Sequence, residues 1–301
     1  MAQTNNFSGL TAYVGVKRDE IIVKASTEAK SLNYFDLILG CKGGTELIPV
    51  LDHSVVLADA SSCGWSEDGS DIISEVPLVV NPAKVEKSFC QRQFEKTWAN
   101  YGLRWEAGRE QLRLEEAFIN GNIYATQDQL EQDLWGSGTT AYGMTGITGQ
   151  LDAVSGETTN VDFSGKTIIE QVDAMVAGMK TDAYKYGYEG KVHLFMGEDS
   201  FANYTAALNN SCCNGPKYDA AAEELPYAGN SRVIIVPVPG LNGSNEMVLA
   251  PARSIAYGTD IENSNSEADF WFDKLDAKYR LRILFMAGVV VKLPQYTVVG
   301  K

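Results

Sequence analysis

Two apolar, strand-forming stretches flank a polar turn in the first third of the chain. The first runs through residues 47–57 and the second through residues 72–89, and β-branched and large apolar side chains recur in both. Residues 61–71 between them are polar and contain glycine, as turns do. We interpret residues 46–98 as a long hairpin that projects from a core, so the rest of the chain must supply that core.

The composition is that of a globular protein. The 301 residues are 45% apolar, enough for one large domain or two ordinary ones. With 25 basic and 39 acidic residues the net charge is −14, so the chain as a whole repels nucleic acid and any contact with DNA must be local. The longest apolar runs, such as Val289–Val291, are too short to cross a bilayer, and we expect no membrane association.

The cysteines indicate a reducing cytoplasm. They stand at positions 41, 63, 90, 212 and 213, an odd number without a C-x-x-C pair, and no charged-then-apolar leader opens the sequence. The neighbours Cys212 and Cys213 have the spacing of a redox switch, but their polar surroundings favour unpaired surface thiols. Cys63, near the hairpin tip, is a candidate for contact with a neighbouring subunit.

The remaining chain divides by its hydrophobic pattern. Residues 1–45 form a weakly patterned arm with little core of its own, and a helix-like stretch runs around Leu32 to Leu39. Residues 105–135 are helical in character with a break at Asn120–Asn122, and the glycine-rich residues 136–149 form a connection between lobes.

The second half combines two patterns. Residues 150–250 alternate helices with buried strands, as in an α/β lobe, and carry a surface insertion at 209–230. The last fifty residues change to strands, with a hairpin turn at Asp273–Asp276. We therefore expect an α+β fold.

Gly165, Lys166 and Thr167 are the three residues that close a phosphate-binding P-loop. The motif also needs a glycine five residues earlier, where Asn160 stands, and a buried strand before it, where residues 153–160 are polar. An amphipathic helix follows, and Thr167 with Glu170 forms a capping-box pattern. The sequence favours a helix start over a nucleotide site.

Other reactive side chains have equally plain structural interpretations. His193 lies inside an apolar strand, as a core histidine does, and His53 beside Asp52 is weak support for a metal. Glu198 and Asp199 open a helix, where acidic side chains complement the dipole. With no G-x-S-x-G elbow, we nominate no catalytic, cofactor-binding or metal-binding residue and expect no enzyme.

Several charged and aromatic side chains, most of them near the end of the chain, are better suited to packing and to contacts between subunits than to catalysis. Basic residues alternate with apolar ones there, which favours intersubunit or solvated charges over DNA ligands; they are Lys274, Lys278, Arg280, Arg282 and Lys292. Trp135, Trp271 and Tyr279 are expected as core or interface anchors.

Three segments carry a resemblance to a known family. Residues 192–201, 246–260 and 278–292 resemble the axial strand-then-helix, the return crossing and the final peripheral strands of the major capsid proteins of tailed double-stranded DNA bacteriophages, the HK97-like fold. The resemblance implies five parts: an N-terminal arm at 1–45, an extended hairpin at 46–98, a peripheral domain with spine helix at 99–149, an axial domain at 150–250, and closing peripheral strands at 251–301.

The resemblance also implies a function. It implies a structural protein that self-assembles into pentamers and hexamers of an icosahedral shell, located in the virion capsid, assembled in the host cytoplasm and enclosing DNA without sequence-specific contact. It further implies a separate scaffolding protein, a portal and possible decoration proteins. Residues 46–83 contain no lysine, so cross-linking through the hairpin is not expected. The alternatives are an encapsulin-type nanocompartment of the same fold and a nucleotide-binding enzyme using Gly165–Thr167.

Overall fold

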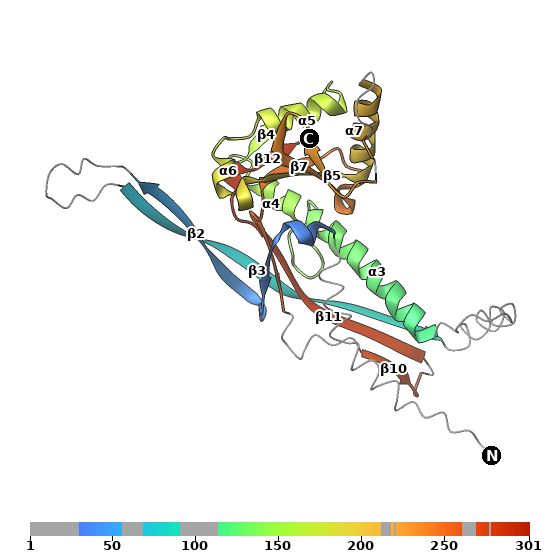
Figure 1. The fold of residues 1–301 in the computed structure, drawn as a ribbon. Coiled ribbons are helices and arrows are strands. Elements are labelled where there is room, and N and C mark those ends of the chain that lie inside the picture. Colours follow the sequence, from blue (N-terminus) through green and yellow to red (C-terminus); the bar gives the residue numbers. More distant parts are fainter. Residues whose placement is uncertain are drawn as a thin grey trace, which may run out of the picture.

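The computed structural model describes residues 30–55, 69–90, 114–211, 218–219, 221–260, 269–276 and 278–301. They form two six-stranded sheets with helices packed against them. Figure 1 shows a compact upper lobe built on the second sheet, and below it a long helix, α3, beside the extended strands of the first sheet.

The first sheet has the strand order β1-β9-β11-β3-β2, and β10 pairs with β11 beside this path. β1 and β9 are parallel, whereas the other pairs are antiparallel. β3 is continuous over 22 residues and pairs with β2 in its first part and with β11 in its second. The strands are β1 (Asp36–Leu39), β2 (Gly44–Val55), β3 (Gly69–Cys90), β9 (Ile255–Thr259), β10 (Asp269–Asp273) and β11 (Lys278–Val291).

The second sheet has the order β4-β12-β8-β5-β7-β6. β5 and β7 are parallel and are connected through helix α7, so this lobe has the α/β character expected for residues 150–250. Its strands are β4 (Thr159–Val161), β5 (Val192–Gly197), β6 (Leu225–Tyr227), β7 (Asn230–Val238), β8 (Met247–Pro251) and β12 (Val298–Gly300).

Helices and short 3-10 turns connect and cover the sheets. The α-helices are α3 (Leu114–Trp135), α4 (Ile147–Ala153), α5 (Ile168–Ala177), α6 (Ala183–Tyr186) and α7 (Glu198–Ser211). The 3-10 turns are η1 (Lys30–Tyr34), η2 (Tyr188–Gly190), η3 (Pro239–Leu241) and η4 (Pro294–Tyr296). None of the helices in the described ranges is both long and apolar enough to span a bilayer.

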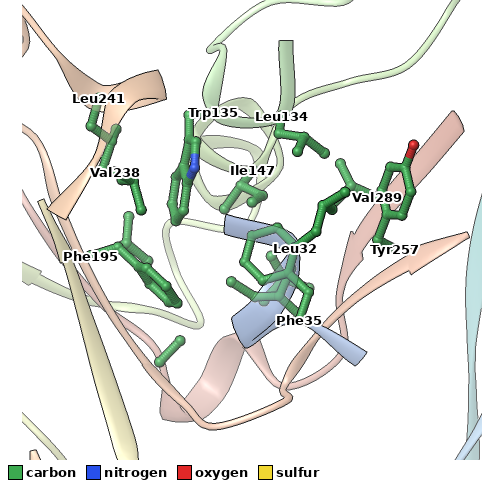
Figure 2. Close-up of a cluster of buried hydrophobic side chains, with 14 of the residues drawn as sticks. Leu32, Phe35, Leu134, Trp135, Ile147, Phe195, Val238, Leu241, Tyr257 and Val289 are labelled. Carbon is green, nitrogen blue, oxygen red and sulfur yellow. The ribbon is translucent and has the colours of Figure 1, made fainter. Parts of the chain in front are cut away.

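The main core lies where α3, η1 and both sheets meet. Trp135 is 2% exposed, and its ring centroid lies 5.1 Å from that of Phe195 and 6.0 Å from that of Phe35. Figure 2 shows these rings together with Leu134 and Val289 in one cluster. The expectation that Trp135 is a core anchor is confirmed.

Strand β5 separates this core from a second one. All six of its residues are buried, and Phe195 points to the Trp135 side, whereas Leu194 and Met196 belong to the cluster under α5 and α7. Alternate side chains of a strand point to opposite faces, so an unbroken apolar run can feed two cores at once.

The structure corrects several local predictions. Residues 32–39 are not a helix but η1 followed by strand β1, because Leu32 and Phe35 are buried in the core and residues 36–39 pair with β9. Helix α3 continues through Asn120–Asn122 without the expected break. Gly121 is exposed there, so its only unfavourable effect is the low intrinsic helix propensity of glycine. The later turns of α3 are buried in the core, and this burial outweighs that effect.

Two boundaries also differ from the expected division. The arm was expected to have little core, yet residues 30–39 contribute to the core and to the first sheet; residues 1–29 lie outside the described part. The closing segment 251–301 was assigned to the peripheral strands, yet β12 pairs with β8 and β4 in the second sheet. Three residues are too few to carry a strand pattern of their own.

Candidate assembly surfaces

The hairpin formed by β2 and β3 projects away from both cores, as Figure 1 shows. Its register places Leu47 opposite Pro77 and Leu51 opposite Ile73. Residues directly opposite each other in an antiparallel pair point to the same face, and residues two apart along a strand share that face. We call the resulting surface the hairpin face; it consists of Thr45, Leu47, Pro49, Leu51, Ile73, Glu75, Pro77 and Val79.

The hairpin face is largely apolar, with Glu75 as its one charged residue, and its side chains are exposed. The exposed fractions are 57% for Leu47, 52% for Leu51, 69% for Ile73 and 48% for Val79. Single exposed apolar residues are ordinary, but a contiguous row of them marks a surface that another molecule covers. Sequence analysis predicted the hairpin but not this face. The signal was the unbroken apolar run 47–51, which puts apolar side chains on both faces of one strand.

The opposite side of the hairpin is anchored at its base. Leu78 and Val80 are fully buried and form a small cluster with Cys41. A Cβ on Gly258 would lie 2.7 Å from Leu78 Cδ2, so glycine allows β9 to approach β3 closely. This anchoring fixes the direction in which the hairpin leaves the first sheet.

A charged surface lies at the other end of β3. Arg280 Nη2 lies 2.8 Å from Asp273 and 2.6 Å from Asp276, and Arg282 Nε lies 3.3 Å from Glu86. Elsewhere Lys292 Nζ lies 2.7 Å from Asp36. Arg280, Arg282 and Lys292 thus form ion pairs within the chain, and the expected role of the cations near the end of the chain as intersubunit or solvated charges stays a prediction.

The side chains between these ion pairs enclose a pocket of about 460 Å³. Trp271 contributes an indole that is 40% exposed, so this tryptophan is not a core residue. We call this site the basic pocket; its lining includes Glu86, Trp271, Asp276, Lys278, Arg280 and Arg282.

The Gly165-Lys166-Thr167 segment forms a helix cap, as predicted. The Thr167 side chain accepts a hydrogen bond from the Glu170 N–H, and the Glu170 carboxylate accepts one from the Thr167 N–H at 2.8 Å. Lys166 Nζ donates to the Asp162 carbonyl. The groups that would hold a phosphate are thus engaged by the chain itself.

The glycine-rich residues 136–149 connect α3 to α4. A Cβ on Gly146 would lie 2.2 Å from the Gly136 carbonyl oxygen, and one on Gly149 would lie 2.4 Å from the Ser137 carbonyl oxygen. The absence of a side chain at Gly146 and Gly149 allows their backbone to pack directly against the backbone of Gly136 and Ser137. Residues 136–149 were expected to form only a connection, and this was wrong for its last residues, because helix α4 begins within the segment, at Ile147.

A buried polar network, which sequence analysis missed, fastens η1 to α3. Glu131 is 2% exposed and accepts hydrogen bonds from the Ser31 hydroxyl and backbone N–H, while Trp135 Nε1 donates to Ser31 Oγ at 2.7 Å. Burial raises the pKa of the Glu131 carboxyl, and the Ser31 hydrogen bonds oppose that shift. A serine and a glutamate 100 positions apart carry no local signal of this contact.

His193 lies in β5, as expected of a core histidine, but it is not fully satisfied. It is 9% exposed, packs edge-on against Tyr34 at 5.1 Å between ring centroids, and its Nδ1 has no hydrogen-bond partner in the described chain. Burial, assisted by the charge of Lys191, lowers the pKa of His193 to about 4.

This pKa predicts a pH-dependent stability. A lowered pKa means that the unfolded chain binds the proton more readily, so the free energy of unfolding should fall as pH drops from 6.5 to about 4, by about 3 kcal/mol at the lower end. Urea unfolding of wild type and His193→Leu across this range checks it. The difference between the two curves should grow on acidification, and a constant difference would contradict the assignment.

The remaining histidine and cysteine side chains considered for metal binding or redox chemistry stay predictions. The side chain of His53 and residues Cys63, Cys212 and Cys213 lie outside the described part. Glu198 begins α7 as predicted and pairs with Lys30 at 3.4 Å. Across the described ranges, no group of His, Cys, Asp and Glu side chains is placed to hold a metal ion.

Comparison with known proteins bears on the fold alone. No protein-family model and no curated protein sequence matches the chain. Solved structures do match along nearly all of it. The satellite phage P4 procapsid including size determination protein has 11% identity and a TM-score of 0.60, with 100% of this chain and 98% of that chain covered. The chain has the HK97-like capsid fold.

Two further structures share the HK97-like fold with this chain. The capsid of a native GTA particle has 11% identity and a TM-score of 0.56, covering 92% of this chain and 90% of that one. A virus-like particle from Pyrococcus furiosus has 8% identity and a TM-score of 0.54, covering 96% and 99%. The α+β, HK97-like fold class expected from the sequence is confirmed.

Proposed function

We propose that the chain is a major capsid protein that self-assembles into pentamers and hexamers of an icosahedral shell enclosing bacteriophage DNA. The observation that carries the proposal is the uncovered hairpin face on a fold that matches capsid structures over nearly the whole chain. A shell subunit must bury surface against copies of itself, and it needs extensions that reach those copies.

The hairpin face supplies the driving force for such contacts. Leu47, Leu51, Ile73 and Val79 each expose about half or more of their surface. Burying an exposed side chain of this size contributes about 1–2 kcal/mol. Repeated at every subunit, these contributions favour the assembled state.

We propose that the chain is divided into the five expected parts, with the end of the arm and the end of the axial domain placed differently. The arm ends before η1, the hairpin spans β2 and β3, and α3 is the spine helix. The axial domain is built on the second sheet and includes β12, and the remaining strands close the peripheral domain. The core that joins α3 to both sheets supports treating these parts as one unit.

The net charge of −14 supports a shell that encloses DNA without binding it tightly. An acidic shell has little affinity for DNA, so the genome can be packed densely and released, without sequence-specific contact. In this proposal the protein acts without a cofactor and not as an enzyme, and it works with a separate scaffolding protein, a portal and possible decoration proteins. It assembles in the host cytoplasm and resides in the virion capsid.

A second candidate is an encapsulin-type nanocompartment shell. The likeness to the virus-like particle from Pyrococcus furiosus favours it, because that chain is covered over 99% of its length. Both candidates use the same subunit contacts and differ in cargo. The nucleotide-binding alternative has weaker support, because the Thr167 and Glu170 groups are committed to a helix cap.

Electron microscopy of the purified chain, with and without scaffold, tests the proposal. Closed shells or flat pentamers and hexamers are expected. In shells isolated from cells, a high ratio of absorbance at 260 to 280 nm identifies packaged DNA, whereas a protein-like ratio favours the nanocompartment. A monodisperse monomer under all conditions would overturn both shell functions.

A further inference from the structure

Three cations without an acidic partner surround the short segment formed by α6 and η2. Lys180, Arg232 and Arg253 are exposed, and none of them forms an ion pair with another of the described residues. Lys180 Nζ donates a hydrogen bond at 2.8 Å to the backbone carbonyl of Gln295, a neutral group, so the charge of this lysine stays uncompensated. We call Lys180, Arg232 and Arg253 the cation cluster.

Tyrosines of the α6–η2 segment hold the two guanidinium groups in place. Arg253 Cζ lies 4.0 Å from the centroid of the Tyr188 ring. Arg232 Cζ lies 5.6 Å from the centroid of the Tyr184 ring, whose hydroxyl accepts a hydrogen bond from Asn230 at 2.5 Å. A guanidinium that stacks on a ring keeps its N–H groups directed outward in its own plane, where an anion can accept them.

The backbone at Arg253 gives no local reason for an arginine. Its φ is 62°, in the left-handed region, which glycine and asparagine adopt at a lower cost. The turn between β8 and β9 therefore gains no stability from the arginine side chain as such. What this residue adds is a stacked guanidinium without an ionic partner, and a strained position of this kind points to a function.

The acidic side chains beside the cation cluster are already paired with other lysines. Asp182 lies 2.7 Å from Lys185, and Glu189 lies 3.1 Å from Lys191. These pairs leave the three charges of the cation cluster uncompensated, on a chain whose net charge is −14. Because salt screens distant charges, such a cluster attracts an anion locally although the chain as a whole repels one.

The basic pocket differs from the cation cluster because its two arginines are compensated. Arg280 Nη2 lies 2.8 Å from Asp273 and 2.6 Å from Asp276, and Arg282 pairs with Glu86. Phosphates that approach this pocket meet carboxylates as well as arginines, and the repulsion offsets the attraction. Figure 1 shows α6 in the upper lobe and β10 at the other end of the molecule, so the two sites are separate.

The chemistry of the cation cluster fits a duplex better than a single strand. Proteins bind single-stranded nucleic acids by stacking unpaired bases on open aromatic rings. Here arginines stack on Tyr184 and Tyr188, and the Tyr186 ring stacks on another tyrosine, with 4.5 Å between centroids. Double-stranded DNA carries about one negative charge per 1.7 Å of its axis, so it offers a phosphate to each exposed cation whatever its sequence.

We propose that the cation cluster binds the phosphate backbone of double-stranded DNA, with Lys180, Arg232 and Arg253 each donating to a phosphate oxygen. The contact rests on the proposed shell function, which supplies the duplex, and it adds a local binding site to an otherwise repelling protein. Because the cations contact phosphates and no base edge, the binding is independent of sequence. It weakens as salt rises, since each phosphate contact releases counterions.

Duplex binding by the purified chain tests the proposal. Fluorescence anisotropy with a labelled duplex, over a series of NaCl concentrations, gives the dissociation constant and its salt dependence. Arg253→Gly with Arg232→Gln removes two phosphate contacts and keeps the turn, since glycine suits the backbone at position 253. The dissociation constant should rise about tenfold, and its slope in a double-logarithmic plot against salt should fall by about two.

Arg280→Gln with Arg282→Gln is the matched control. It removes the same charge from the basic pocket, where carboxylates compensate the arginines. The dissociation constant for the duplex should stay within about twofold of the wild-type value, because screened charges act only near the DNA. Thermal unfolding shows that both variant pairs are folded.

The outcomes separate the contact from the shell function. If shells form but the wild-type chain binds no duplex, or if both variant pairs lose affinity equally, the DNA contact is wrong and the shell function stands. Tighter binding of the single strand, or equally tight binding of polyglutamate, would assign the cluster to bases or to an acidic protein and overturn the proposal. A chain that binds the duplex but never forms shells overturns the shell function, and with it a packaged genome as the source of the duplex.

Discussion

A chain carrying Leu51→Glu together with Ile73→Glu should remain folded and fail to assemble. These residues lie opposite each other on the hairpin face and are 52% and 69% exposed, so the main cost to the single chain is the repulsion between two facing carboxylates, and its free energy of unfolding should fall by only about 1 kcal/mol. In a shell the same positions are covered, and burying two unpaired carboxylates opposes association by several kcal/mol. Sedimentation and electron microscopy report the assembly, and thermal unfolding reports the fold.

The matched control keeps the apolar character of the pair. Leu51→Met with Ile73→Val changes shape but adds no charge, and shells should form near wild-type concentrations. If the glutamate pair assembles as readily as this control, the hairpin face is not an interface. The shell must then be held by other surfaces.

Trp135→Ala should remove much of the stability of the single chain. Trp135 is 2% exposed, packs against Phe35 and Phe195, and donates a hydrogen bond to Ser31. Truncating a buried tryptophan lowers the free energy of unfolding by about 3–5 kcal/mol, a large share of a total stability of about 5–15 kcal/mol. Urea unfolding below the assembly concentration measures the change.

Tyr124→Ala is the control on the same helix. Tyr124 is 61% exposed, so its truncation should change the free energy of unfolding by less than about 0.5 kcal/mol. A loss below about 1 kcal/mol for Trp135→Ala would mean that the cluster where α3 meets both sheets does not hold the fold together.

Features with a local cause were predictable from the sequence. The helix start at Thr167 needs only residues three apart, and both hydrogen bonds of its capping box are present. Strand β5 is an unbroken apolar run followed at once by a helix start, and it lies buried in the second sheet. The turn at Asp273–Asp276 joins β10 to β11 as its residues indicate.

Features that depend on distant partners were not predictable. Residues 36–39 have a helix-like composition, but they form a strand because they pair with β9, more than 200 positions away. The continuity of α3 through Gly121 reflects the burial of its later turns. Tertiary packing outweighs local propensity in both cases.

The candidate surfaces were partly foreseen. The hairpin and its lack of lysine came from the sequence, and so did the cluster of cations near the end of the chain. The ion pairs that neutralise Arg280 and Arg282, and the donors they leave unpaired, depend on the register between β3 and β11. Strand pairing across about 200 residues cannot be read from either strand alone.

The continuity of β3 has a mechanical consequence. Val80 is the last residue paired with β2, and the next residue, Asn81, already pairs with β11. A pull on the hairpin therefore travels along one extended backbone into the first sheet, where the β3–β11 hydrogen bonds share the load in shear instead of opening one by one. Under outward pressure, a shell built from such subunits would be held by extended, hydrogen-bonded strands that transmit tension directly, and not by flexible connections.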